Sequence, residues 1–375
     1  MSEKVSPLYP AYIIDGERQA AAPWQILDSV SVFPQESVCY GEDCPAVVDE
    51  TPDVSPSSYA PDARKVEKYL NSVLRAERRF PMQFAGSYTR GRIAWALLDC
   101  IWRMGRFRIG DLALDACWHW NSLQIGNMAG FYRSVEAMGD MLDALNLKLR
   151  DYSCKDTDGP CSLELGCELS PLAGESDIVE QPFTTANPQM GAGSISNSLQ
   201  NDLQSWLVYI PFDSSPYRLG GSLLAQSQGI NSPVAPALDD ADYFLDCYEV
   251  VRELVEDGIV LAGATVGEGG LIAAVKGMTN SKTGVNIDIS DIRRACPGTD
   301  IVSILFAEIP GVLIQIRDID FDYVDAELLL QDVAFYPLGH PIANGGEVRV
   351  HSSAKTGLQN ILESLVQRQG GEGED

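Results

Sequence analysis

The chain has 375 residues, of which 45% are hydrophobic, a composition that is typical of a folded protein and a length that suggests two domains. Acidic residues outnumber basic ones by 53 to 27, and the formal net charge of −26 argues against a surface for nucleic acid or an anionic membrane. The sequence contains no run of eighteen apolar residues and no basic segment followed by an apolar one, so we expect no membrane span, no secretory signal and a cytoplasmic protein.

The first half of the chain predicts an extension followed by an α/β domain. Residues 1–60 are rich in proline and acidic residues and predict an N-terminal extension with one strand, over Trp24–Val32. The elements predicted for the next domain, residues 61–195, are a charged helix, an apolar helix, a strand and an amphipathic helix: Lys65–Arg79, Arg90–Met104, Asp111–Ala116 and Met128–Leu145.

Residues 170–200 show little periodicity and predict a domain linker or loop. A second α/β domain is predicted over residues 203–351, with a C-terminal helix and disordered acidic tail over residues 352–375. Its predicted strands are Ser205–Pro211, Asp257–Ala262, Ile301–Phe306 and Val312–Arg317, and its predicted amphipathic helix runs from Tyr243 to Leu254.

Two glycine turns are the most informative feature of the chain. The first lies in Tyr217-Arg-Leu-Gly-Gly-Ser-Leu-Leu-Ala-Gln226 and the second in Val266-Gly-Glu-Gly-Gly-Leu-Ile-Ala-Ala-Val275. Each follows a predicted strand and opens an apolar helix, where free backbone N–H groups can hold an anion such as a phosphate. The alternative is that the glycines only permit a helix to pack closely on a strand.

The cysteines do not predict a metal site. There are nine, an odd number, and no CxxC pair occurs among them. With only three, widely spaced histidines, we expect no zinc site. Most thiols should be buried and reduced, with Cys154, Cys161 and Cys167 as the exception, in a loop where they can be exposed.

Several further segments, spread over residues 20–350, carry a resemblance to a known family through their residues and their order along the chain. They are Ala22-Pro-Trp-Gln25, Gly91-Arg-Ile-Ala94, Gly126-Asn-Met-Ala-Gly-Phe-Tyr-Arg-Ser-Val-Glu136, Gly284-Val-Asn-Ile-Asp288 and Leu305-Phe-Ala-Glu-Ile-Pro-Gly-Val-Leu-Ile-Gln-Ile316. Together with the glycine turns, they resemble the second half of the large phosphoribosylformylglycinamidine synthase, which belongs to the aminoimidazole ribonucleotide synthase superfamily.

The resemblance implies an α+β or α/β fold of two domains. The N-terminal sheet domain would form a barrel on dimerisation, and the C-terminal domain would be a mixed sheet covered by helices. Because half of such an assembly leaves a sheet face and edge exposed, we expect a homodimer or a pair with a complementary synthase half. The implied cofactors are ATP and Mg²⁺, with ATP activating an amide oxygen as a phosphate ester that ammonia then displaces.

The chain departs from the family's motifs. Where the family has His-Asp-x-Ser-Asp-Gly-Gly-Leu, this chain has Ala264-Thr-Val-Gly-Glu-Gly-Gly-Leu271, and where the family has Gly-Lys-Asp-Ser-Met it has Leu149-Arg-Asp-Tyr-Ser153. The Phe-Asn-Glu-Glu turn keeps only Phe306 and Glu308. The sequence has no Glu-x-His-Asn-His segment and no Cys-His-Glu set for generating ammonia, so we expect an incomplete catalytic set.

Candidate site residues follow from matching positions, and no catalytic residue is assigned. The implied contacts to a nucleotide or phosphate are Arg150, Arg218, Gly220, Gly221, Ser222, Gly269 and Gly270. The implied Mg²⁺ ligands are Asp151, Glu268 and Glu308, since Mg²⁺ prefers oxygen ligands. The structural alternative is that Asp151 and Glu268 cap helices and Arg218 forms a surface salt bridge.

Two functions therefore remain open. The first is a module of a formylglycinamidine-synthase-like ligase of purine biosynthesis, a scaffold that can bind a small anionic nucleotide while the chemistry sits on a partner. The second is a non-catalytic pseudoenzyme that acts as a structural or protein-interaction subunit.

Overall fold

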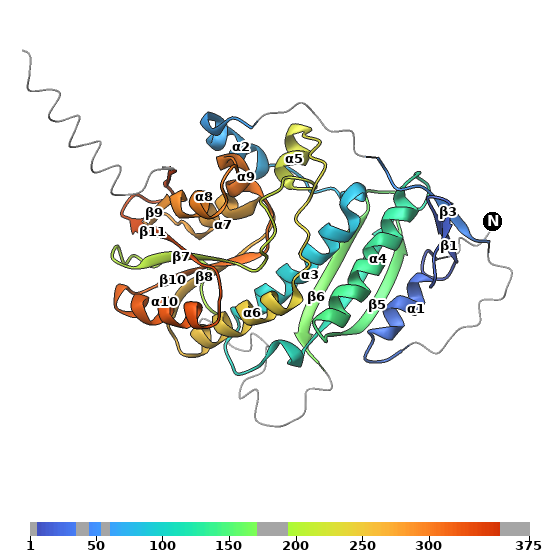
Figure 1. Ribbon diagram of the computed structural model, residues 1–375, viewed down its shortest axis with the longest axis horizontal. Helices are drawn as coiled ribbons and strands as arrows, with labels where there is room; N and C mark the ends of the chain where they lie inside the picture. Colours follow the sequence, from blue (N-terminus) through green and yellow to red (C-terminus); the bar gives the residue numbers. More distant parts are fainter. Residues whose placement is uncertain (1–5, 35–44, 54–60, 171–193, 353–375) are drawn as a thin grey trace, which may run out of the picture.

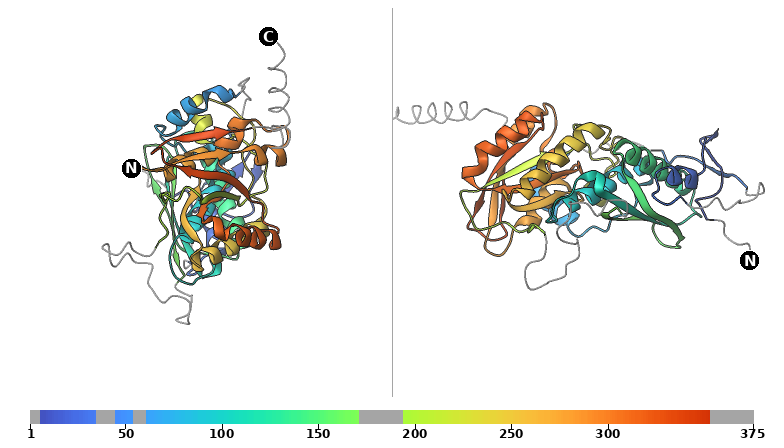
Figure 2. Two further views of the ribbon diagram at one scale, coloured as in Figure 1. Left: turned by 90° about the vertical axis from the view of Figure 1, so that its left-hand side faces the viewer. Right: turned by 90° about the horizontal axis from the view of Figure 1, so that it is seen from below.

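A computed structural model describes residues 6–34, 45–53, 61–170 and 194–352 (Figure 1). The strands form one six-stranded sheet and two three-stranded sheets. The large sheet and its helices lie at one end of an elongated molecule, and the small sheets lie toward the other (Figures 1 and 2). The predicted combination of N-terminal sheets with a helix-covered C-terminal mixed sheet is confirmed. The predicted acidic tail and most of the predicted linker lie outside the described residues.

A small sheet with the order β2-β1-β3 begins the chain. β1 (Tyr12–Ile14) pairs antiparallel with β2 (Glu17–Arg18) and parallel with β3 (Val47–Asp49). Asp15 and Gly16, between β1 and β2, both have positive φ, at 54° and 81°. A two-residue hairpin turn of the I′ type requires this conformation at both positions.

The strand predicted over Trp24–Val32 is wrong, because Pro23–Ser29 forms the helix α1. Pro23 suits the first helical position, where its missing N–H costs no hydrogen bond. The Ala22 N–H donates to the Gln25 side chain at 2.8 Å, which fixes the start of the helix. α1 packs against α4 (Asn127–Ala144), so tertiary contact supports a segment whose apolar content alone also suits a strand.

The second small sheet has the order β5-β4-β6. β4 (Leu112–Trp120) pairs parallel with β5 (Lys148–Asp156) and antiparallel with β6 (Ser162–Leu169). Every second side chain of β4 is buried, ending with Trp118 and Trp120. This alternation places one face of the sheet in the core and leaves the other face open.

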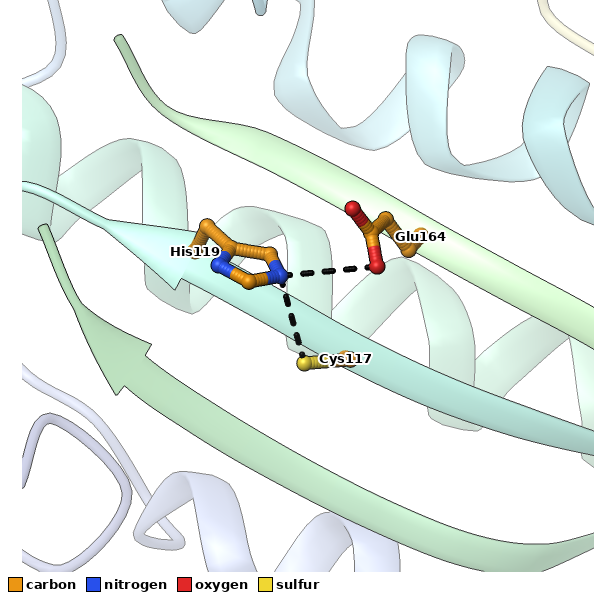
Figure 3. Close-up of side chains that lie close together, drawn as sticks. All are labelled: Cys117, His119 and Glu164. Carbon is orange, nitrogen blue, oxygen red and sulfur yellow. Dashed lines mark hydrogen bonds and ion pairs between the residues drawn. The ribbon is translucent and has the colours of Figure 1, made fainter. Parts of the chain in front are cut away.

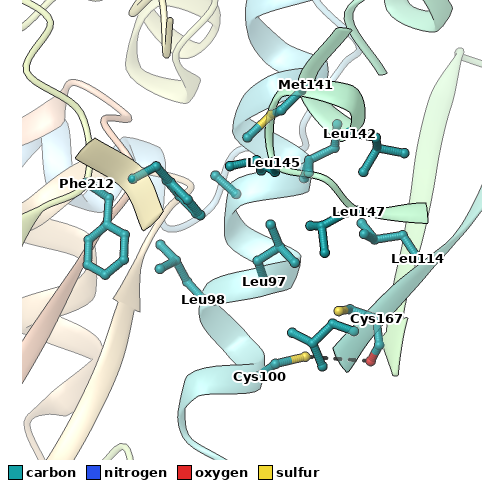
Figure 4. Close-up of a cluster of buried hydrophobic side chains, with 14 of the residues drawn as sticks. Leu97, Leu98, Cys100, Leu114, Met141, Leu142, Leu145, Leu147, Cys167 and Phe212 are labelled. Carbon is teal, nitrogen blue, oxygen red and sulfur yellow. Dashed lines mark hydrogen bonds between the residues drawn. The ribbon is translucent and has the colours of Figure 1, made fainter. Parts of the chain in front are cut away.

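Helices α3 (Ala85–Ile101) and α4 cover the buried face of this sheet. α4 confirms the amphipathic helix predicted there, and α3 begins five residues earlier than predicted. Figure 4 shows Leu97 and Leu98 of α3 packed among side chains of the small sheet on one side and Phe212 of the C-terminal half on the other. One continuous core therefore joins the two halves of the chain.

The six-stranded sheet has the order β12-β9-β11-β7-β10-β8, and all its pairs are antiparallel except β12 with β9. Its strands are β7 (Trp206–Pro211), β8 (Val260–Val266), β9 (Gly284–Asp288), β10 (Gly311–Ile316), β11 (Tyr336–Ile342) and β12 (Val348–His351). Because β7 and β8 both run antiparallel to β10, they run parallel to each other, and their C-terminal ends meet at one edge of the sheet.

Helices cover both faces of the large sheet (Figure 1). On one face lie α6 (Ala241–Glu256) and α10 (Phe321–Leu330). On the other lie α2 (Val66–Val73), α5 (Leu223–Gln228), α7 (Gly270–Met278), α8 (Ser290–Ala295) and α9 (Ile301–Phe306). Short 3₁₀ helices precede α2, α3, β4 and α10: η1 (Ala63–Lys65), η2 (Met82–Phe84), η3 (Ile109–Asp111) and η5 (Asp318–Asp320).

The strand predicted over Ile301–Phe306 is wrong, because this segment is α9. The Asp300 carboxylate accepts a hydrogen bond from the Ser303 N–H at 2.9 Å and caps the helix N-terminus. The apolar run is buried on nearly all sides, which hides the helical period that would have identified it. The partner strand predicted at Val312–Arg317 is confirmed as β10, which lies between β7 and the edge strand β8.

The prediction that Cys154, Cys161 and Cys167 share an exposed loop is wrong. Cys154 and Cys167 lie in strands, and Cys161 and Cys167 are buried. Within the described segments, no helix combines the length and the apolar character that crossing a membrane requires.

Arg252 of α6 ties the end of α3 to the C-terminal half. Its side chain is 0% exposed, and it donates to the backbone carbonyls of Ile101 at 2.5 Å, Arg103 at 2.7 Å and Gly105. The guanidinium lies 4.2 Å from the centre of the Phe107 ring. One buried and two partly buried carbonyl groups therefore accept hydrogen bonds from one side chain.

We predict that Arg252→Met lowers the free energy of unfolding by about 3 kcal/mol, because the buried Ile101 carbonyl and the partly buried carbonyls of Arg103 and Gly105 lose their donor. Urea unfolding measures the change. The matched control is Arg218→Met, at an exposed arginine, where the expected change is within about 0.5 kcal/mol. Equal effects of the two substitutions would contradict this role of Arg252.

Candidate functional site

The two glycine turns lie close together at one edge of the large sheet. The first follows β7 and leads into α5, and the second follows β8 and opens α7. Both strands end at the edge where β10 starts, since Gly311 pairs with Pro211 on one side and Val266 on the other. The segment before β10, which contains Glu308, therefore lies at the same edge as the two turns.

The Glu308 carboxylate joins the two turns. Its Oε1 accepts hydrogen bonds from the N–H of Leu223, at the start of α5, and from the N–H of Gly269, at the start of α7, both at 2.8 Å. Arg78 Nη2 donates to both carboxylate oxygens at 2.6 Å. The Glu308 side chain is 8% exposed, and burial raises the pKa of its carboxyl, while Arg78 and the two amides counteract that rise.

Arg78 completes this buried cluster. Its side chain is 11% exposed, and besides Glu308 it donates to the Gly221 carbonyl at 2.9 Å. Its Nε lies 3.4 Å from Glu268, and its guanidinium lies 5.4 Å from the centre of the Tyr88 ring. Of the amides predicted for a phosphate, that of Gly269 is thus already bound to a carboxylate of the chain itself, together with that of Leu223.

The glycines also serve close packing. A Cβ at Gly220 would lie 2.3 Å from the carbonyl oxygen of Val234, and Gly220 N donates to that same oxygen at 2.9 Å. Gly270 has a φ of +73°, and a Cβ there would lie 2.7 Å from the carbonyl carbon of Phe306. Both positions therefore require glycine for the fold, whichever ligand the turns meet.

Ser222 caps α5, its hydroxyl accepting from the Ala225 N–H at 3.2 Å and donating to the Leu219 carbonyl at 2.8 Å. Its hydroxyl is buried and used within the turn. Arg218, two residues before the glycines, is exposed.

The predicted Mg²⁺ ligands do not form one set. Glu308 uses its oxygens for Arg78 and two amides. Glu268 lies between two guanidinium groups, 3.4 Å from Arg78 and 3.3 Å from Arg92. A cation beside these carboxylates would face two fixed positive charges, so the arrangement does not fit Mg²⁺.

Arg150 and Asp151 lie in β5 of the small sheet, away from the glycine turns (Figure 1). The Arg150 guanidinium pairs with Asp115 and with Glu168, the latter at 2.8 Å. Asp151 is exposed and accepts a hydrogen bond from the Tyr152 N–H at 2.9 Å. The structure therefore brings together Gly220, Gly221, Ser222, Glu268, Gly269, Gly270 and Glu308, but not Arg150 or Asp151.

The sequence prediction missed Arg78, because it placed this residue in a helix over Lys65–Arg79. The helix α2 ends at Val73, and the arginines that follow lie on the connection to α3. A signal was present: Arg75, Arg78 and Arg79 crowd five positions of a chain with twice as many acidic as basic residues.

A wide cleft of about 1190 Å³ adjoins the buried cluster. The three arginines line it, together with Gln226 of α5 and residues 158–161 between β5 and β6. A second cavity, lined by Tyr88, Trp95, Gly221 and Glu308 among others, has about 30 Å³, enough for roughly one water molecule. Of these two cavities beside the cluster, the cleft is the one with room for a ligand.

We predict that Glu308→Gln lowers the free energy of unfolding by about 3 to 5 kcal/mol, because it leaves the Arg78 charge buried without its partner and turns an amide NH2 group toward that guanidinium. Chemical unfolding monitored by tryptophan fluorescence measures the loss. Glu268→Gln, at a carboxylate that is 37% exposed, is the control, with an expected loss of at most about 1 kcal/mol. A Glu308→Gln chain as stable as this control would show that the carboxylate does not hold the turns together.

Comparison with known proteins assigns the fold. Residues 214–332 match the protein family described as AIR synthase related protein, C-terminal domain. The human (Homo sapiens) phosphoribosylformylglycinamidine synthase is 22% identical over 261 residues, which cover 68% of this chain and 18% of that protein. The chain thus spans less than a fifth of the length of this relative.

Among solved structures, one with a TM-score above 0.5 agrees with this match in its fold. T. maritima PurL complexed with FGAR has a TM-score of 0.52 at 12% identity, over 78% of this chain and 51% of that one. T. maritima PurL complexed with AMPPCP has a TM-score of 0.46 at 12% identity, over 75% of this chain and 40% of that one. At such identities the likeness concerns the fold. Residues 214–332 thus match the C-terminal domain of AIR synthase related proteins, and the chain is distantly similar to phosphoribosylformylglycinamidine synthase.

Proposed function

We propose that the chain is a non-catalytic scaffold module of the phosphoribosylformylglycinamidine synthase type, which supports an assembly rather than carrying out ligase chemistry. The observation that carries this proposal is the Glu308 carboxylate, bound to the N–H groups at the starts of α5 and α7. A phosphate could reach those donors only by displacing a buried, charge-paired carboxylate. Such a displacement would leave Glu308 or Arg78 buried without a partner, which is strongly unfavourable.

The altered motif after β8 supports the same proposal. Thr265 stands where the resembling family has an aspartate, and its hydroxyl donates to Asp99 at 2.7 Å and accepts from the Trp102 indole at 3.0 Å. Gly263 lies against the same indole ring, where a Cβ would be 2.1 Å from a ring carbon. The residues that replace the motif thus join β8 to α3, a structural use of the position.

The cleft beside the cluster favours a second candidate function, namely that the chain binds a small phosphorylated ligand. Arg75 and Arg79 are exposed in the cleft, and the cleft has room for a nucleotide. In this candidate function ATP with Mg²⁺ would bind through arginine side chains rather than through the glycine turns. The phosphate contacts proposed for Arg218, Gly220, Gly221, Ser222, Gly269 and Gly270 would then not be used.

We predict that ATP with Mg²⁺ at millimolar concentration leaves the melting temperature of the chain unchanged. A ligand at a hundred times its Kd adds about 2.7 kcal/mol, which would raise the melting temperature by several degrees. Differential scanning fluorimetry, with calorimetric titration as a second readout, makes the test. A rise in the wild-type chain rejects the purely structural function.

A matched pair of variants then locates any nucleotide. If ATP with Mg²⁺ stabilises the wild-type chain, loss of that effect in Arg75→Ala/Arg79→Ala, but not in Arg349→Ala, would assign binding to the cleft. Arg349 is a half-exposed arginine of β12, which is the outermost strand of the large sheet on the side opposite β8. If Arg75→Ala/Arg79→Ala is still stabilised by ATP with Mg²⁺, the nucleotide would instead be assigned to the glycine turns.

We also propose that the scaffold pairs through the small sheet, with a second copy or a complementary synthase half. Among the described strands, β6 pairs only with β4, so the backbone N–H and C=O groups that point away from β4 lie at an edge without a partner strand. Such an edge is a ready template for a strand of another chain. This edge and the open outer face suit the barrel that the resemblance implies.

We predict that the purified chain sediments at twice its monomer mass. Leu165→Pro, in the middle of β6, should shift it toward the monomer, because the Leu165 N–H faces away from β4 and proline removes this donor from the free edge. Analytical ultracentrifugation gives the masses. Pro341→Ala, in the interior strand β11, is a control that leaves this edge unchanged. A monomer at all concentrations, in the absence of another chain, would leave the complementary half as the partner to be tested by co-purification.

A further inference from the structure

The open face of the small sheet carries a cluster unrelated to the glycine turns. Cys117 and His119 of β4 and Glu164 of β6 place their sulfur, nitrogen and oxygen atoms within 4.8 Å of one another (Figure 3). The helices α3 and α4 cover the opposite face of this sheet, so the cluster faces outward. The His119 side chain is 30% exposed and Glu164 is 71% exposed, which leaves the cluster open to a small ion.

Strand geometry explains why the residues meet. Cys117 and His119 are two positions apart on β4 and therefore share one face, opposite to the buried Trp118. Cys117 lies directly across from Glu164 in the antiparallel register of β4 and β6. Cross-strand neighbours in such a pair have Cβ atoms only about 4.5 to 5.5 Å apart, so rigid backbone pairing holds the three side chains near one point.

The two distances from His119 match a tetrahedral metal site. His119 Nε2 lies 3.6 Å from Cys117 Sγ and 3.4 Å from a Glu164 carboxylate oxygen. A tetrahedral Zn²⁺, with bonds of about 2.3 Å to sulfur and about 2.0 to 2.1 Å to nitrogen and oxygen, would hold S and N about 3.5 Å apart and N and O about 3.4 Å apart. The side chains thus already stand close to the required separations.

The same contacts do not suit a catalytic triad. A thiol nucleophile, a histidine base and an orienting carboxylate need two different ring nitrogens, one facing the thiol and one facing the carboxylate. Here both Cys117 and Glu164 face Nε2 of His119 (Figure 3). One nitrogen cannot pass a proton between them, but it can be one corner of a coordination shell.

We propose that Cys117, His119 and Glu164 form a binding site for a zinc-class divalent cation. Thiolate and imidazole are ligands that such ions prefer, and Mg²⁺ does not favour them. Three protein ligands leave a fourth position for water or for a donor from another chain. The net charge of −26 adds a general attraction for cations.

The proposal revises the expectation drawn from the sequence. That expectation relied on the missing CxxC pair and the wide spacing of the histidines. The relevant pattern is instead Cys-x-His on a strand, completed by a carboxylate 45 positions further along the chain. Sequence spacing could not supply the register of β4 and β6 that brings Glu164 to the pair.

The test is metal binding by the full chain in a thiol-free reductant. Zn²⁺ is titrated in competition with a chromophoric chelator, and Co²⁺ is used as a spectroscopic probe. We expect one equivalent of each ion to bind, and bound Co²⁺ to show thiolate-to-metal charge transfer and the intense visible bands of tetrahedral coordination. Cys117→Ser, His119→Gln and Glu164→Gln should each weaken Zn²⁺ binding at least tenfold, since loss of even an outer-shell partner costs about 10- to 100-fold.

Two control variants separate the site from general effects. Cys296→Ser removes a thiol that is also partly exposed, and Glu168→Gln removes a carboxylate from the same face of β6. Both should bind Zn²⁺ as the wild-type chain does, with circular dichroism confirming that every variant is folded. Absence of stoichiometric binding, or a folded Cys117→Ser that keeps both the affinity and the charge-transfer band, would overturn the proposal.

Discussion

The buried ion pair between Glu308 and Arg78 is the constraint on which the C-terminal half is organised. One carboxylate receives two helix N-termini and a guanidinium, so α5, α7 and the connection after α2 are held at a single point. The glycines permit this approach, because side chains at Gly220 and Gly270 would collide with the backbone. The helix dipoles that could favour a bound phosphate instead stabilise an internal negative charge. The same arrangement that builds the fold therefore also opposes the binding of a phosphate at these amides.

Much of the fold could be predicted from the sequence, for identifiable reasons. The amphipathic helix α4 and the strand β7 have clear periods and boundary residues, and both were found. The segments that became α1 and α9 were assigned as strands, since a short apolar run has no period that distinguishes the two. In α1 a proline start and packing on α4 decided the outcome, and in α9 the Asp300 cap did so. Such decisions depend on contacts that a local window of sequence cannot contain.

The candidate site was also predicted only in part. The glycine turns and Glu308 were predicted as site residues, and they meet because β7 and β8 run parallel on either side of β10. Arg78 was not predicted, since its partner lies 230 positions away. Arg150 was predicted for a phosphate and instead pairs with Asp115 and Glu168 on the open face of the small sheet. Charge type can be read from sequence, whereas the partner of a charge depends on the three-dimensional arrangement.

The position of α3 has a consequence for how this molecule comes apart. Its apolar side chains belong to a core that runs without a break from the small sheet to one face of the large sheet (Figure 4). Melting either layer would strip α3 of half its contacts and expose the other layer to water. The two halves should therefore denature in one cooperative transition, and separate expression of either half would yield an unstable fragment. Evolution of this chain by exchange of whole domains would accordingly be difficult, and change by substitution within an intact fold would be the easier route.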